Sequence, residues 1–283
     1  MTTPTIHTMP LIHLVGGEKG GVGKTFVSRI LCQYFKDKGQ EFTLVEADSQ
    51  INDVGRIYHE QATSTHTLTL SDDPEYMGEP DIIFNATAET PAIVNLPSNT
   101  QSVLDTWIAQ ANILELAREC LGGHGIVKWF VSDGCYESLR QLQTSLAAHN
   151  NGIPHVVIFN RGRLNGRNFD HVIEDPLFQT IQEAPNFIAH IEIPDLYSPI
   201  QFLMDKDELT IESARPVVKE KQGILGEQRI KTFHDTCTQA FDEALESLER
   251  AWELPDAERE EQAEAQSESD TASEAETDRK EFV

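Results

Sequence analysis

The chain has 283 residues, of which 39% are hydrophobic and 24% charged, and its formal net charge is −25. This composition is sufficient for a sizeable hydrophobic core, and no run of about 18 apolar residues predicts a membrane-spanning helix. An acidic chain lacks the basic surface that non-specific DNA binding requires, so a DNA-coating role is disfavoured. The four cysteines form no CxxC pair, which favours reduced thiols in the cytoplasm over a zinc site.

The amino-terminal residues predict a strand–helix–strand unit. An apolar run at 10–16 predicts a buried strand, and apolar residues recur at helical spacing from Lys24 to about Lys38. Gly39 lies where a helix C-cap is expected, and residues 41–47 predict a second strand. Two strands joined by a helix over so short a stretch are typical of a parallel sheet.

The same alternation continues along the chain. We expect further strands at 81–85, 126–131, 155–160 and 187–193, and helices at 101–120, 137–148, 168–178 and 226–252. The predicted fold is therefore α/β, with a mainly parallel twisted sheet flanked by helices on both faces, in one domain over residues 1–254. Residues 255–283 are poor in apolar side chains and rich in acids, which predicts a disordered acidic tail.

The strongest motif is the glycine-rich run Gly16–Thr25, which follows the first strand and opens the first helix. In this context it predicts a phosphate-binding loop. Glycines let phosphate oxygens approach the backbone N–H groups, the lysine before the helix neutralises the outer phosphates, and the following hydroxyl can bind Mg²⁺. We expect ATP and Mg²⁺ to be held by Gly20, Gly21, Val22, Gly23, Lys24, Thr25 and Phe26.

The standard phosphate loop would begin with glycine at position 18, but this chain has Glu18 there and a second lysine, Lys19. The run Lys-Gly-Gly-Val-Gly-Lys-Thr resembles the deviant Walker A motif of the family that contains the ParA and MinD positioning ATPases, the nitrogenase iron-protein relatives and the CobQ/CobB enzymes. The resemblance implies a P-loop NTPase fold and a homodimer that forms on ATP binding. It also implies that Lys19 reaches the phosphates of the partner subunit.

Two carboxylates follow the second predicted strand, where the family usually has an acidic pair. By resemblance, Asp48 orients the attacking water and is, with Thr25, a candidate Mg²⁺ residue, and Glu46 supports the water shell of the metal or the loop. The alternative is a pair of solvent-facing acids at a strand end.

The next family motif is an apolar strand that ends in aspartate, which normally holds a magnesium-bound water. We assign this position to Asn85, at the end of the strand expected over 81–85, with residues 87–97 as the second switch. An amide brings no charge, so we expect weaker Mg²⁺ binding and slow ATP hydrolysis.

The strand expected over 155–160 resembles the family strand whose terminal asparagine contacts the nucleotide base. Asn160 is the candidate base contact, and Arg161 would stack on the base. The alternative for Asn160 is capping of a turn. Residues 193–195 resemble the loop that often covers the base in the family.

The distribution of charge indicates which partners the chain can bind. The bases Arg215, Lys219, Lys221, Arg229 and Lys231 are diluted by the acids Glu212, Glu220 and Glu227, so DNA binding is possible but disfavoured. The carboxyl terminus is too acidic for a membrane-binding amphipathic helix.

The motifs together favour an ATP-dependent dimerisation switch of the ParA type with slow hydrolysis. It would position or partition a cargo, such as plasmid DNA or a conjugation complex, through a ParB-like protein or cargo adaptor that stimulates hydrolysis. A non-hydrolysing regulatory adaptor is the alternative. A CobQ/CobB-like metabolic enzyme is less favoured, because the chain leaves no room for a further substrate domain.

Overall fold

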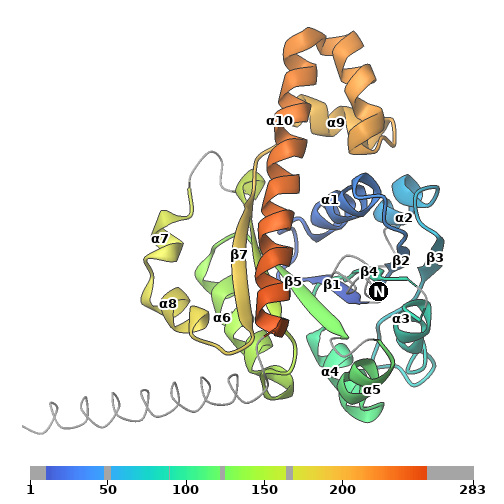
Figure 1. Cartoon of the computed structure of the whole chain (residues 1–283), viewed down its shortest axis with the longest axis vertical. Helices are drawn as coiled ribbons and strands as arrows, with labels where there is room; N and C mark the ends of the chain where they lie inside the picture. Colours follow the sequence, from blue (N-terminus) through green and yellow to red (C-terminus); the bar gives the residue numbers. More distant parts are fainter. Residues whose placement is uncertain (1–10, 48–51, 89, 122–124, 164–167, 254–283) are drawn as a thin grey trace, which may run out of the picture.

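A parallel sheet forms the centre of the computed structural model, which describes residues 11–47, 52–88, 90–121, 125–163 and 168–253 (Figure 1). The strands are β1 (Ile12–Gly16), β2 (Thr43–Glu46), β3 (Ser64–Thr67), β4 (Ala92–Asn95), β5 (Ile126–Ser132), β6 (His155–Asn160) and β7 (Phe187–Ile193). Their order is β3-β2-β4-β1-β5-β6-β7, and every pair is parallel. The predicted α/β class is confirmed.

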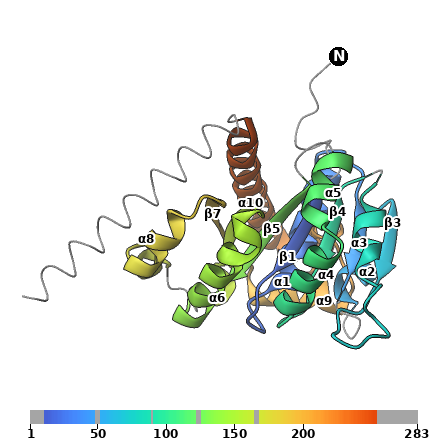
Figure 2. The same cartoon turned by 90° about the horizontal axis from the view of Figure 1, so that it is seen from below.

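Helices cover both faces of the sheet (Figures 1 and 2). One face carries α1 (Lys24–Asp37), α2 (Asp53–Tyr58), α9 (Ser198–Lys206) and α10 (Ile211–Glu253). The other carries α3 (Asp81–Ala86), α4 (Gln101–Gln110), α5 (Ile113–Cys120), α6 (Tyr136–Ala147), α7 (Asp170–Ile173) and α8 (Pro176–Gln182), with 3-10 turns at Ala148–Asn151 and Arg161–Arg163.

The central strand β1 is buried on both faces. Leu11, just before it, and Val15 pack into the core beneath α1 and α10, whereas Ile12 and Leu14 pack into the core on the other face. Because successive strand side chains point to opposite faces, a strand buried on both sides is apolar along almost its whole length. The phosphate loop therefore begins at the most enclosed part of the sheet.

The last helix, α10, bends at Gly223, where φ is 74° and ψ is −170°. An ion pair of 2.9 Å between Lys219 Nζ and Glu227 Oε2 joins the two arms beside the bend. Figure 1 shows this end of α10, together with α9, projecting beyond the sheet. The helix predicted over 226–252 is the second arm, and the first arm and α9 were not predicted.

The strand predicted over 81–85 is wrong, because these residues form α3. The strand next to β1 is instead β4, ten residues later, in the segment that we expected to be a switch loop. Both segments are short apolar runs, and periodicity cannot separate a short strand from a short helix. Pro80 and Asp81 begin α3, as proline and acids do in a first helical turn.

Other differences are smaller. The helix predicted over 101–120 is divided into α4 and α5 by Asn112, whose φ is 48°, and α2 and β3 were not predicted. The predicted acidic tail at 255–283 lies outside the described residues. Over the part of the chain that the structure describes, no helix is long and apolar enough to cross a membrane.

The aromatic contact between α10 and the sheet gives a test of the fold. Phe241 is fully buried, and its ring centroid lies 5.2 Å from that of Trp129 and 5.5 Å from that of Tyr34. Phe241→Ala is expected to lower the free energy of unfolding by about 3–5 kcal/mol, because the cavity cannot be filled. Ile224→Ala, at a side chain that is 74% exposed, should change it by less than about 0.5 kcal/mol in the same urea titration.

Candidate nucleotide site

The phosphate loop connects β1 to α1 at the carboxyl edge of the sheet. Gly23 is the N-cap of α1, has a φ of 101°, and supplies no side chain to cap the helix. The N–H groups of Thr25 and Phe26 in the first turn therefore point toward the loop without a helical acceptor, which is the arrangement that binds anions. A Cβ on Gly23 would lie 2.3 Å from Asn160 Nδ2, so only glycine fits here.

Lys24 turns back over the loop and is 8% exposed. Its ammonium group donates to Ser98 Oγ at 2.6 Å and to the backbone oxygen of Lys19 at 3.2 Å. Ser98 follows β4, so this lysine joins the phosphate loop to the segment after the neighbouring strand. An ammonium group at this place can meet the outer phosphates of a nucleotide.

Lys19 lies on the outer side of the loop, and its side chain is 37% exposed. It forms an ion pair with Asp133, which follows β5, and its Nζ lies 3.1 Å from Cys135 Sγ. The hydrogen bond to Asp133 raises the pKa of Lys19. Burial alone would raise the pKa of Asp133, but hydrogen bonds with Lys19 and Cys135 hold it below its usual value. The two loop lysines therefore occupy separate places.

The ends of β2 and β4 lie side by side and share a buried polar cluster. Asn95 Nδ2 donates to Glu46 Oε1 at 2.5 Å, and Ser28 Oγ donates to Asn95 Oδ1 at 3.0 Å. Glu46 is fully buried, and its other oxygen accepts the N–H of Val54 at 3.3 Å. Ser28 lies one helical turn beyond Thr25 on α1, so the Asn95 amide faces the same side of α1 as the Thr25 hydroxyl.

These positions correct the assignment of Asn85. Asn85 is exposed in α3, the helix that leads into the amino end of β4, whereas the phosphate loop follows the carboxyl end of β1. In a parallel sheet these are opposite edges, so Asn85 cannot reach the nucleotide site. The terminal residue of the neighbouring strand is also an amide, Asn95. Asp48 lies outside the described residues.

Asn160 is 4% exposed, at the end of β6. Its Nδ2 donates to the backbone oxygen of Val22 at 2.9 Å, and its Oδ1 accepts the N–H of Gly162 at 3.0 Å. Asn160 therefore holds the phosphate loop and caps a turn, the alternative raised by the sequence. Arg161 points toward β7 and pairs with Glu192.

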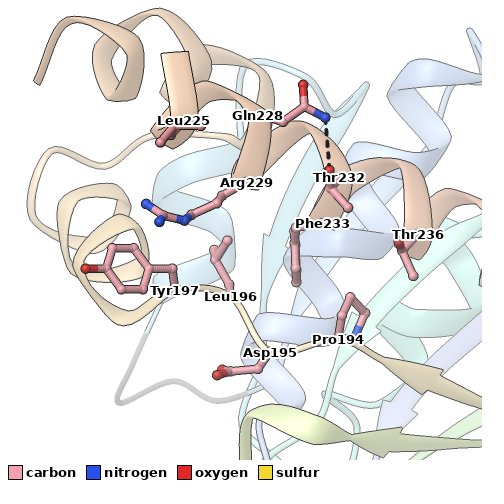
Figure 3. A pocket seen from close by; sticks show the side chains of 10 residues that line it. All are labelled: Pro194, Asp195, Leu196, Tyr197, Leu225, Gln228, Arg229, Thr232, Phe233 and Thr236. Atoms are coloured by element: carbon pink, nitrogen blue, oxygen red, sulfur yellow. Dashed lines mark hydrogen bonds between the residues drawn. The ribbon is translucent and has the colours of Figure 1, made fainter. Parts of the chain in front are cut away.

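A cavity of about 500 Å³ lies between the loop after β7 and α10 (Figure 3). Its lining includes Asp195 and Tyr197 from the loop and Arg229 and Phe233 from α10. The ring centroid of Phe233 is 5.7 Å from that of Phe26, the residue after Thr25. The cavity therefore adjoins the beginning of α1.

Sequence reasoning missed four residues that contact the loop or its neighbours: Ser28, Asn95, Ser98 and Asp133. The available signal was the apolar run at 92–94, which lies between Pro91 and Pro97 and ends in a polar residue. Prolines at both ends are typical of a short strand entering and leaving the sheet.

The basic cluster on α10 is largely neutralised. Lys219, Lys221 and Lys231 pair with Glu227, Asp207 and Asp235 at 2.5–2.9 Å. The Arg229 guanidinium lies over the Tyr197 ring, 4.8 Å from its centroid. Among the described residues, no group of three or more His, Cys, Asp or Glu side chains could hold a metal ion.

A family model for the CobQ/CobB/MinD/ParA nucleotide binding domain matches residues 14–196. The chain belongs to this family. The match begins in β1 and ends after β7, so it covers the phosphate loop, β4 and the loop residues up to Leu196 that line one side of the cavity. The resemblance inferred from Lys19–Thr25 is confirmed.

Individual relatives of this nucleotide-binding domain are distant or match only in part. Protein MobD from Acidithiobacillus ferrooxidans is 38% identical over 61 residues, which are 22% of this chain and 26% of MobD. A nucleotide-binding protein from Archaeoglobus fulgidus in complex with ADP is 15% identical, with a TM-score of 0.48 over 71% of this chain and 88% of that one. The septum site-determining protein MinD from Pyrococcus horikoshii, complexed with Mg-ADP, is also 15% identical, with a TM-score of 0.48 over 79% and 94%.

Gly23 gives a test of the loop geometry. Gly23→Ala is expected to weaken nucleotide binding by about tenfold to a hundredfold, because a Cβ strains the left-handed backbone and displaces Asn160. Gly39→Ala is the matched control, since Gly39 also has a positive φ (68°) but has nothing within 4 Å of an added Cβ. Gly39→Ala should lower the free energy of unfolding about as much as backbone strain does in Gly23→Ala. It should leave binding of a fluorescent ATP analogue unchanged. Equal binding of the analogue by both variants would contradict the role given to Gly23 in the phosphate loop.

Proposed function

We propose that this chain is an ATPase of the ParA type, in which binding of ATP and Mg²⁺ drives dimerisation and hydrolysis reverses it. The observation that carries the proposal is the separation of the two loop lysines. Lys24 is buried over the loop and bonded to Ser98, whereas Lys19 is half-exposed outside the loop and paired with Asp133. One ammonium group can serve the nucleotide of its own subunit, and the other is placed to serve a second subunit.

Lys19 can leave Asp133 for the phosphates of a second subunit at a small cost in free energy. Exposed or half-exposed ion pairs contribute about 0–1 kcal/mol, so a triphosphate presented by a partner can compete with Asp133 for the lysine. In the proposed switch Lys19 leaves Asp133 when the second subunit brings its phosphates. The ATP-bound dimer would then be held together by charge that neither subunit can neutralise alone.

The residues fit a largely hydrated Mg²⁺, which usually takes few protein ligands and several waters or phosphate oxygens. The Thr25 hydroxyl would hold the ion, and the Asn95 amide would hold one of its waters. When bound, the ion would neutralise charge on the phosphates during transfer. We retain Asp48 as the proposed residue that orients the attacking water.

We expect slow hydrolysis because of Asn95, which takes the place that the sequence had assigned to Asn85. The strand end beside the loop carries an amide, and the nearby carboxylate of Glu46 is held by that amide and by the N–H of Val54. The negative charge of Glu46 therefore lies at the end of β2, whereas the family motif places a carboxylate at the end of the strand beside β1, which here is β4. A non-hydrolysing adaptor is the second candidate, favoured by the same observation.

The cavity between the β7 loop and α10 is the proposed place of the purine. It adjoins Phe26 through Phe233, and its lining is mixed aromatic and polar, as base sites usually are. The bonds of Asn160 favour a supporting role beneath the base, and Arg161 stacking stays a prediction.

The proposed partners are a second copy of the chain and a protein that stimulates hydrolysis, either ParB-like or a cargo adaptor. Plasmid DNA or a conjugation complex is the proposed cargo. Direct DNA binding has less support, because the lysines on α10 are paired with acids and the chain carries a charge of −25.

Dimerisation tests the switch. With ATP and Mg²⁺, the wild type is expected to shift from monomer to dimer in sedimentation experiments, and Lys19→Ala should bind ATP yet remain monomeric. Asp133→Asn should dimerise at an ATP concentration up to about fivefold lower, because it weakens the competing ion pair.

Lys36→Ala is the matched control, since Lys36 is another half-exposed lysine that pairs with an acid, Glu212, but it lies at the far end of α1. It should behave as the wild type. A wild type that binds ATP without any change in oligomeric state would overturn the switch.

The Asn95–Glu46 pair tests the explanation of slow hydrolysis. The exchange Asn95→Asp with Glu46→Gln keeps one carboxylate and one amide in contact but moves the charge to the end of β4. It is expected to raise phosphate release by about tenfold and to lower the Mg²⁺ concentration required. Asn95→Asp alone should be destabilised by two buried carboxylates. Asn85→Asp, at the opposite edge, should leave turnover unchanged, and an equal effect at both asparagines would refute the assignment.

A further inference from the structure

A buried lysine lies beneath the phosphate loop and has no role in the function described so far. Lys128, the third residue of β5, is 3% exposed. A Cβ on Gly16, the last residue of β1, where the glycine-rich run begins, would lie 3.5 Å from Lys128 Cε. Burying an ammonium group is costly unless it is hydrogen-bonded and its charge is balanced. The groups around Lys128 must therefore supply both.

The hydrogen-bond partners of Lys128 come from two helices, α4 and α6. Its ammonium group donates to Gln101 Oε1 at the start of α4 and to Ser145 Oγ of α6 at 2.8 Å. Ser145 Oγ lies 2.8 Å from His155 Nε2, and His155 Nδ1 lies 2.7 Å from the backbone oxygen of Ile153. Since a carbonyl only accepts, Nδ1 carries the proton and Nε2 accepts from Ser145. Burial and the charge of Lys128 lower the pKa of His155 to about 3, so His155 is neutral.

Gln101 connects this network to the phosphate loop. Its backbone N–H donates to Glu18 Oε2 at 3.3 Å, and its side-chain amide donates to Asp105 Oδ1 at 2.6 Å. Gln101 also follows Ser98 by three residues, and Ser98 holds Lys24. One short segment is thus bonded to the front of the loop through Glu18 and to its back through Lys24.

Glu18 is unexpected at this place, because a carboxylate at the front of a phosphate loop repels phosphate. Two features balance its charge: the N-terminus of α4, through the N–H of Gln101, and the ammonium group of Lys128 behind it. Burial lowers the pKa of Lys128 to about 8, against the opposing influence of Glu18 and Asp105.

We propose that Lys128 is a positioning residue for ATP binding: its ammonium group holds Gln101, and through Gln101 it fixes Glu18 and the phosphate loop. The inference rests on the proposed function, since it concerns the same nucleotide site. The protonated lysine supplies both the hydrogen bond to Gln101 and the charge that offsets Glu18. Loss of the proton removes this charge and leaves Glu18 balanced only by the N-terminus of α4.

Because the protonated form of Lys128 supports the loop, ATP affinity should fall at high pH. ATP affinity is full below the pKa of Lys128, about 8, and falls as the pH rises through it. The titratable groups that face Lys128 are Glu18 from the loop, Asp105 from α4 with His149 bonded to it, and His155 from β6. The ring of Phe130 lies 5.9 Å from the ammonium group and does not titrate.

The test measures binding of a fluorescent ATP analogue with Mg²⁺ by the full chain between about pH 6.5 and 9.5, a window centred on the expected titration. The wild type is expected to lose about tenfold in affinity across this range, as one charge near the phosphates disappears. Lys128→Met should bind weakly at every pH. Lys128→Arg keeps its charge throughout, so its affinity should match that of the wild type at pH 7 and stay constant to pH 9.5. Lys36→Met should keep the wild-type profile.

A wild-type pH slope in Lys128→Arg would overturn the proposal, as would wild-type affinity in Lys128→Met. If neither variant folds, calorimetry of the wild type at pH 8.5 in two buffers of different ionisation enthalpy decides. Proton uptake on ATP binding supports the proposal, and its absence overturns it. These outcomes differ from failure of the proposed function, in which the wild type would bind no ATP at any pH or would bind it without dimerising.

Discussion

The backbone turn at Gly23 is the constraint on which the nucleotide site depends. The chain must leave β1 at the centre of the sheet and enter α1 with its first N–H groups aimed at the loop. A left-handed residue without a Cβ makes this possible, because the Asn160 amide fills the space that a side chain would need. The amide then holds Val22 in place. The loop is shaped by β1, β6 and α1 together, although its residues are contiguous in sequence.

Positive charge is concentrated around this turn, although the composition of the chain as a whole is acidic. The chain is strongly acidic, yet three lysines surround the loop, each in a different setting. Lys24 is bonded to a hydroxyl, Lys19 to a carboxylate at the surface, and Lys128 to an amide and a hydroxyl in the interior. In the proposed switch, Lys19 must leave its carboxylate partner, Asp133, before it can bind an incoming anion. In the proposed function, the three settings would separate nucleotide binding by Lys24, dimerisation through Lys19 and support of the loop by Lys128.

The sequence was sufficient to predict the loop, the βαβ unit and the family, because these depend on local patterns that few other structures share. It was not sufficient to place β4. Ala92–Asn95 and Asp81–Asn85 are apolar runs of similar length, and only the position beside β1 shows which one is the strand. The error moved the metal-side amide from Asn95 to Asn85. Asp133 and Lys128 could not be found from motifs, since their importance comes from contacts with residues more than a hundred positions away or from burial. The role expected for Asp48 stays a prediction.

The two borders of the sheet limit how copies of this protein can associate. β3 is the outer strand on one side, has only four residues, Ser64–Thr67, and alternates half-buried and exposed side chains. β7 is the outer strand on the other, and Glu192 near its end pairs with Arg161. Short polar outer strands and charges near a strand end discourage strand-to-strand addition. Growth of the sheet into fibres or domain-swapped ribbons by addition of strands at these two edges is therefore disfavoured.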